Sequence, residues 1–132
     1  MAVRVTLLIK KLDTLTDEEF HNYWEGPHAQ IFLGVPIVKE KILKNQPQAA
    51  NRTTFHVDKT TSAALAAQGL PVAEYDGEVN LWAASLEDIM AMYTDPEYQR
   101  LVLPDGEVFS KTKESKIMIG YDKDFVANGK VL

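Results

Sequence analysis

The residues best placed to do chemistry in this chain lie in one short stretch near its N-terminus. Phe20, Tyr23 and Trp24 are spaced to share one face of a helix, and His28 follows shortly after them. An imidazole titrates near neutral pH and can move protons, and an aromatic wall beside it suits a flat organic molecule. The stretch predicts a pocket for such a molecule. The alternative is an ordinary amphipathic helix whose aromatic face packs in the core.

A helix over about 17–25 is needed to hold these side chains. Thr16 can cap it, and Glu19, three residues on, completes a capping box. Gly26-Pro27 predicts a break, which would leave the imidazole at a helix end or on a loop.

Hydrophobic periodicity gives the remaining elements. Strands are expected over about 3–11, 37–45, 78–84 and 115–121, with 53–57 extending a strand or forming an edge piece. Helices are expected over about 62–68, 86–93 and 96–103, the last ended by Asp105-Gly106. The order β-α-β-β-α-β predicts a ferredoxin-like α+β fold.

We expect one domain over 1–132, with 122–132 as a tail that packs on a partner or hangs free. The 46–74 insertion is expected either to wall a pocket or to form a solvated loop.

Composition restricts the function classes. The net charge of −5 argues against nucleic acid and against an anionic membrane surface as partners. The chain has no cysteine, and no apolar run approaches the ~18 residues of a membrane span. We therefore expect a soluble, cytoplasmic protein. Neither a metal-ligand spacing nor a nucleotide-binding motif is present, so no metal and no cofactor are expected.

Further candidates for the chemistry are more scattered. His56 is a second imidazole, on or beside a strand. Tyr75 and Asp76 precede a strand, where Asp76 can act as a base or orient an imidazole, although Asp-Gly is also a strong turn signal.

Other side chains can bind a substrate. Trp82 and Tyr98, with Tyr23 and Trp24, either line the pocket or pack in the core. Lys44 and Arg52 either hold a substrate carboxylate or are solvated surface charges.

Three motifs together resemble the EthD family. They are Phe20-x-x-Tyr23-Trp24-x-x-x-His28-Ala29, the segment from Tyr75-Asp76-Gly77 to Trp82, and Asp95-Pro96-Glu97-Tyr98, and they occur in family order. The resemblance implies that two copies pair their sheets into a dimeric α+β barrel, so a homodimer is expected. The chain departs from the bacterial pattern at Lys44-Asn45-Gln46, where a histidine is common, and His56 is the candidate to replace it.

The resemblance also implies an activity. Family members include polyketide cyclases, decarboxylases, dehydratases and anthrone oxygenases, and the chain looks most like the fungal group. We therefore expect a cofactor-independent decarboxylase of an aromatic polyketide β-keto acid, of the atrochrysone-carboxylic-acid type, with His28 as proton shuttle. The alternatives are a cyclase or dehydratase, a cofactor-free anthrone oxygenase, a heme-handling protein and a non-catalytic ligand-binding barrel.

Overall fold

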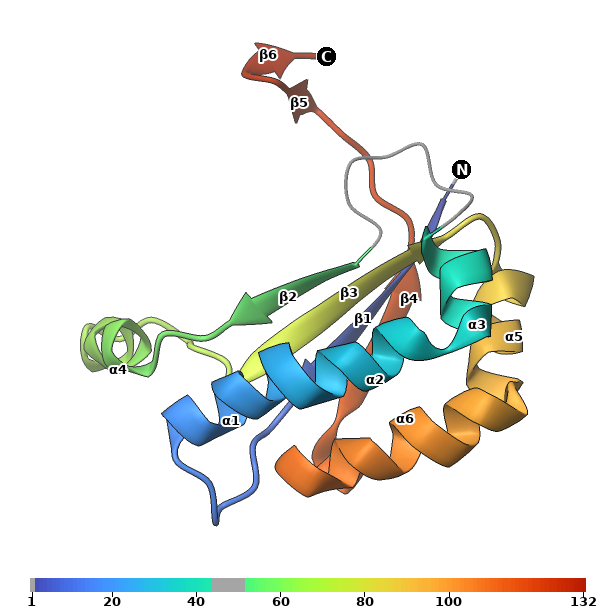
Figure 1. Ribbon diagram of the computed structural model, residues 1–132. Helices are drawn as coiled ribbons and strands as arrows, with labels where there is room; N and C mark the ends of the chain where they lie inside the picture. The colour runs from blue at the N-terminus through green and yellow to red at the C-terminus, as the bar shows by residue number, and fades with distance from the viewer. Residues whose placement is uncertain (1, 44–51) are drawn as a thin grey trace.

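One antiparallel sheet carries helices on one of its faces (Figure 1). The computed structural model describes residues 2–43 and 52–132. The strand order is β2-β3-β1-β4, with bounds Val3–Ile9 for β1, Arg52–His56 for β2, Gly77–Ala83 for β3 and Lys116–Gly120 for β4. The predicted ferredoxin-like α+β fold is confirmed.

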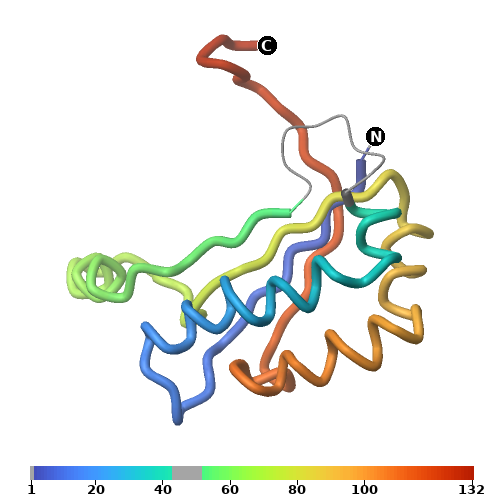
Figure 2. Tube along the Cα trace, viewed as in Figure 1, coloured from blue at the N-terminus to red at the C-terminus, as the bar shows by residue number. Residues whose placement is uncertain are grey.

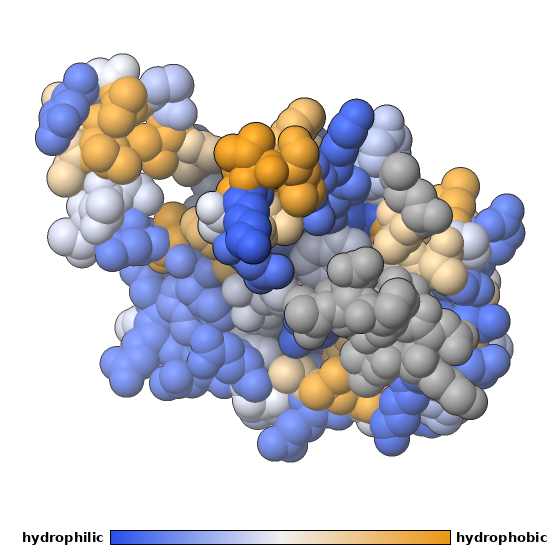
Figure 3. All heavy atoms as spheres, turned by 90° about the horizontal axis from the view of Figure 1, so that it is seen from above, coloured by the Kyte–Doolittle hydropathy of each residue, from blue (hydrophilic) through white to orange (hydrophobic). Residues whose placement is uncertain are grey.

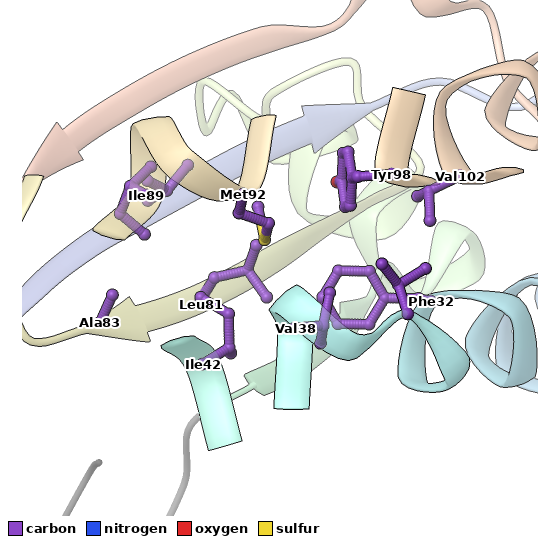
Figure 4. Close-up of a cluster of buried hydrophobic side chains, with 11 residues drawn as sticks. Phe32, Val38, Ile42, Leu81, Ala83, Ile89, Met92, Tyr98 and Val102 are labelled. Carbon is purple, nitrogen blue, oxygen red and sulfur yellow. The ribbon is translucent and has the colours of Figure 1, made fainter. Parts of the chain in front are cut away.

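The alternating pattern of the strands places the core between the sheet and the helices. Val5 of β1 pairs with Leu81 of β3, and both are buried on the face toward the helices. Helices α5 (Leu86–Thr94) and α6 (Pro96–Phe109) supply Ile89, Met92 and other core side chains from the opposite side (Figure 4). This packing fixes the register of the sheet, because a one-residue slip would turn the buried side chains outward.

The helix that carries the N-terminal motif does not break where the sequence predicted. The capping box forms, with Glu19 N–H donating to Thr16 Oγ1 at 3.1 Å. The chain then runs without interruption through α1 (Asp17–Tyr23), η1 (Trp24–His28) and α2 (Ala29–Gly34), so the break predicted at Gly26-Pro27 is wrong. The wider π-helical turn of η1 accommodates Pro27, which lacks the N–H and whose ring would crowd a regular α-helix. His28 therefore lies within a continuous helical segment.

The strand predicted over 37–45 is also wrong for the residues that the structure describes. Residues 36–43 are helical, as α3 (Pro36–Val38) and η2 (Lys39–Leu43). Val35, Val38 and Ile42 are all buried, and their spacing of three and four is the helical period, not the strand period. The second strand is β2, at the edge of the sheet, where the β-branched run over 53–57 had suggested an edge piece.

A second predicted break is absent from α6. This helix continues through Pro104 and Asp105-Gly106 to Phe109, before the short turn η3 (Thr112–Glu114). Burial of Val102 and Phe109, two turns apart, holds the last turns against the core. Asp105 is thereby placed on a helix facing the N-terminal helical segment.

Two segments project from this body (Figure 2). Helix α4 (Lys59–Ala67), capped by Asp58, has no buried residue and extends past the end of the sheet (Figure 1). The tail forms a small hairpin of β5 (Val126–Ala127) and β6 (Lys130–Val131). Its turn residues Asn128 and Gly129 have φ values of 52° and 75°, the left-handed pair that a tight hairpin requires.

Candidate active site

A cavity lies between the sheet and the helices. Its volume is about 130 Å³, it is partly open to solvent, and its wall is mostly apolar. Side chains from β1, β3 and the helices line it, among them Leu7, Trp24, Phe32, Val79, Leu81, Tyr93, Tyr98, Val102 and Phe109. Besides two tyrosines, the titratable side chains at this wall are His28 and Arg52, among the residues that the structure describes. The shape and lining suit a flat, largely apolar organic molecule.

His28 is held by a carboxylate that the sequence analysis did not single out. Its Nδ1 lies 2.8 Å from Oδ2 of Asp105, and the Tyr23 hydroxyl donates to Oδ1 of the same carboxylate at 2.6 Å. An ionised carboxylate only accepts hydrogen bonds, so Nδ1 carries the proton and donates it to Asp105. Nε2 is then the unprotonated nitrogen, and it is the one left for a ligand.

The electrostatics keep this imidazole neutral. Burial lowers the pKa of His28, Asp105 partly offsets this, and the positive charge of Arg52 lowers the pKa further. The hydrogen bond to Asp105 raises the pKa of Tyr23 to about 12, so the phenol remains a donor. A neutral imidazole with a fixed tautomer is a ready proton acceptor.

Arg52 places a positive charge at the same wall. Its guanidinium lies over the ring of Phe32, with Cζ 4.9 Å from the ring centroid. Its Nε is buried and has no hydrogen-bond partner among residues 2–43 and 52–132. Burial lowers the pKa of Arg52 and raises that of Tyr98, which lines the cavity nearby.

The second histidine candidate lies in a different environment. His56 Nδ1 is 2.6 Å from Nδ1 of His21, and His56 Nε2 is 3.0 Å from a carboxylate oxygen of Glu25. Its ring packs on Trp24, with centroids 4.4 Å apart. His56 is not among the residues lining the cavity, whereas Trp24, on which it packs, lines the cavity together with His28.

Asp76 and Tyr75 also lie outside this cavity. The carboxylate of Asp76 accepts the backbone N–H of Lys11 at 2.7 Å and forms an ion pair with Lys59. Both residues line a separate, shallower depression under α4, so the insertion does wall a pocket, although not the one that holds His28. Catalytic roles for Tyr75 and Asp76 remain predictions that this placement does not favour.

Of the remaining residues predicted to bind substrate, some line the cavity and others lie outside it. Trp24 and Tyr98 line the cavity, whereas Tyr23 does not and instead donates to Asp105, the carboxylate that holds His28. Trp82 donates from Nε1 to Asp122 at 2.6 Å, on the other face of the sheet from Leu81. Lys44 lies outside the described residues.

Asp105 could have been found from helix periodicity alone. It follows Tyr98 by seven residues and Val102 by three, and so falls on the same helix face as both. Reading Asp105-Gly106 as a helix end hid this relation.

Residues 12–113 match the EthD domain, and the chain belongs to this family. It is 28% identical over 115 residues to "Dehydratase ustZ" of Ustilaginoidea virens, covering 87% of this chain and 79% of the relative. It is 27% identical over 122 residues to "Decarboxylase nsrE" of Aspergillus novofumigatus, covering 89% and 76%. The chain is thus similar to fungal proteins named for two different eliminations.

Solved structures agree on the fold. An EthD family protein from Bacillus halodurans superposes with a TM-score of 0.60 at 14% identity, covering 93% of this chain and all of the other. A dimeric protein of ferredoxin-like fold from Bacteroides fragilis superposes with a TM-score of 0.53 at 12% identity, covering 90% and 94%. Within the described part of the chain, no helix is long and apolar enough to cross a membrane.

Proposed function

We propose that this protein is a cofactor-independent lyase that forms an enolate of an aromatic polyketide in the cavity beside His28. The observation that carries the proposal is the hydrogen bond from His28 Nδ1 to Asp105, which leaves Nε2 as a base at an apolar wall. Similarity to proteins named dehydratase and decarboxylase supports the reaction class, since both eliminations pass through an enolate or its equivalent.

Dehydration is the reaction that this site favours first. Nε2 of His28 removes the proton from the carbon beside a carbonyl, and the electron pair moves onto the carbonyl oxygen, near the charge of Arg52. The electron pair then returns to form a carbon–carbon double bond and expels the β-hydroxyl group, which takes the proton from Nε2 and leaves as water. The base must start neutral, and the lowered pKa of His28 meets that requirement.

Decarboxylation of a β-keto acid of the atrochrysone-carboxylic-acid type is the second candidate. The mostly apolar wall favours it, because transfer out of water destabilises a carboxylate more than it destabilises a delocalised enolate. The carbon–carbon bond to the carboxylate breaks, its electron pair forms the enolate, and an acid then protonates the carbon. His28 supplies that proton only after it has been protonated, which its lowered pKa makes less common at neutral pH.

Mass spectrometry of products separates the candidates. The purified protein is incubated without cofactor with an aromatic polyketide β-hydroxy ketone and with a β-keto acid, beside His28→Asn. Loss of water above the spontaneous rate, abolished by the substitution, supports the dehydratase, and loss of carbon dioxide under the same test supports the decarboxylase. Gain of oxygen would indicate an oxygenase instead, and tight binding without turnover would indicate a binding protein.

A homodimer is the expected assembly. The face of the sheet turned away from the helices exposes Phe55 and Met118, which are 59% and 56% accessible. The tail adds Phe125 and Val131, 70% and 84% accessible, and Figure 3 shows apolar side chains gathered at this end of the molecule. Apolar exposure on this scale is typical of an interface, and the Bacteroides fragilis protein of this fold is described as dimeric. Light scattering should give a dimer at micromolar concentration, and a monomer there would contradict the proposal.

A further inference from the structure

The guanidinium of Arg52 is the feature of the cavity that the proton transfer alone does not explain. A buried positive charge without a partner is costly, and natural cores keep such groups paired or hydrogen-bonded. Here Nε is buried with no hydrogen-bond partner among residues 2–43 and 52–132, while the side chain borders the mostly apolar cavity.

The orientation of the guanidinium narrows the kind of ligand. The ring of Phe32 lies on one side of the guanidinium, with Cζ 4.9 Å from the ring centroid, so a ligand must approach from another side. Nε is covered, but the two Nη groups present two parallel N–H donors along the outer edge, and this fork matches two oxygens held side by side in one plane. Tyr98, whose pKa is raised by burial and which therefore keeps its proton, adds a hydroxyl donor at the same wall.

We propose that Arg52 binds the two side-by-side oxygens of a β-dicarbonyl substrate. It stabilises the negative charge that spreads over these oxygens when the substrate is converted to its enolate. This inference rests on the proposed lyase function and specifies its substrate class. The substrate therefore carries a β-dicarbonyl group, as a β-diketone or a β-keto acid, in addition to the hydroxyl or carboxylate group that leaves. Its ring lies against the apolar wall that includes Trp24.

Benzoylacetone is a suitable probe because it has no leaving group and cannot be turned over by elimination. Its enolate absorbs at a longer wavelength than its neutral form, so the apparent pKa of the bound probe is measured directly by titration. The wild-type protein should lower that pKa and bind benzoylacetone about tenfold or more tighter than butyrophenone, which lacks one of the two oxygens.

Four variants make the test specific. Arg52→Met should abolish both the pKa shift of the probe and the preference over butyrophenone, and Arg52→Lys, which keeps the charge without the fork, should restore only part of each. Arg100→Met is the matched control, because Arg100 is exposed and paired with Glu97, and it should leave both unchanged. Trp82→Phe removes the tryptophan on the other face of the sheet, so that the remaining fluorescence change reports on Trp24 in the cavity.

Two outcomes overturn the inference: equal binding of benzoylacetone and butyrophenone, or an enolate shift that survives in a folded Arg52→Met. If benzoylacetate displaces benzoylacetone and the displacement depends on Arg52, the substrate class includes β-keto acids. If benzoylacetate does not compete but the pKa shift of bound benzoylacetone is retained, the site is specific for β-diketones. His28→Asn should still bind the probe, because binding does not require the base. If the pKa shift of bound benzoylacetone depends on Arg52 but the protein turns over no substrate, the lyase function is rejected and the β-dicarbonyl binding site is retained.

Discussion

Trp24 packs on one histidine group and lines the same cavity as the other, and the two groups are built differently. On the cavity side, His28 is paired with the carboxylate of Asp105, which in turn accepts from Tyr23. On the outer side, His56 meets another imidazole, His21, at 2.6 Å between their Nδ1 atoms. A hydrogen bond between two imidazole nitrogens needs one donor and one acceptor and can run in either direction, whereas a carboxylate fixes one tautomer.

The surroundings of the two histidines favour His28 over His56 as the predicted catalytic residue. Burial lowers the pKa of both His28 and His56. His28 borders an apolar cavity and has Nε2 left for a ligand, but His56 has Nε2 near Glu25 and Thr54 and Nδ1 near His21. Both nitrogens of His56 are thus already engaged, which leaves it to support the outer side of Trp24.

The largest expected effect is on turnover. His28→Asn should lower kcat by about 10²–10⁴-fold, the usual contribution of a general base, while His56→Asn should change it by only about a few-fold. Steady-state rates with the substrate identified by mass spectrometry provide the measurement. Comparable losses in both variants would show that the outer pair takes part in the chemistry.

A smaller loss is expected from the carboxylate that orients the base. Asp105→Asn keeps the shape but lets the amide donate to Nδ1, which favours the wrong tautomer of His28, and kcat should fall about tenfold or more. Because Asp105 raises the pKa of His28, the acid limb of kcat/KM should also move to lower pH. Tyr23→Phe is the matched control, since it removes one donor to Asp105 and leaves the bond to His28. A Tyr23→Phe loss as large as that of Asp105→Asn would mean that the phenol, not the carboxylate, orients the site.

The sequence predicted the capping box and the strands over about 3–11, 78–84 and 115–121, because strand alternation and cap signals are local. It also singled out His28, whose catalytic role stays a prediction. It failed where tertiary packing overrode local breakers. Pro27 lies in a π-helical turn, and Pro104 and Gly106 lie inside α6. The failure at Gly106 explains why Asp105 was not recognised, since its position beside His28 depends on a helix that the Asp-Gly signal argued against.

The role of Gly77 also could not be read from local signals. Asp76-Gly77 was interpreted as turn chemistry, but the structure gives the glycine a packing reason as well. A Cβ at Gly77 would lie 2.6 Å from a ring atom of Trp24 and 2.8 Å from the carbonyl oxygen of Phe55. The absence of a side chain lets Trp24 lie against the sheet, and this contact joins the two histidine regions.

Gly77→Ala should therefore damage both sides of Trp24 at once. Overpacking of this kind costs about 1–3 kcal/mol in the free energy of unfolding, measured by denaturant titration. The matched control is Gly120→Ala, where a Cβ would meet no atom within 4 Å. Equal stability of the two variants would indicate that Trp24 moves freely, and the contact of its ring with both regions would then be in doubt.

The smallest expected effect is on acid stability. A histidine whose pKa is lower when folded than when unfolded binds its proton less readily in the native state, so protonation favours unfolding. The stabilisation is present above the unfolded pKa of about 6.5 and is lost as the pH falls through the lower folded pKa. Thermal unfolding of His28→Gln and His56→Gln across this window should each show a weaker dependence on pH than the wild-type protein, with the larger change for the more deeply buried His28. Above the window the difference between each variant and the wild type should not change with pH. If His56→Gln changed the slope more than His28→Gln, the outer pair would be the main site of proton uptake on unfolding, and the deeper burial assigned to the cavity side would be wrong.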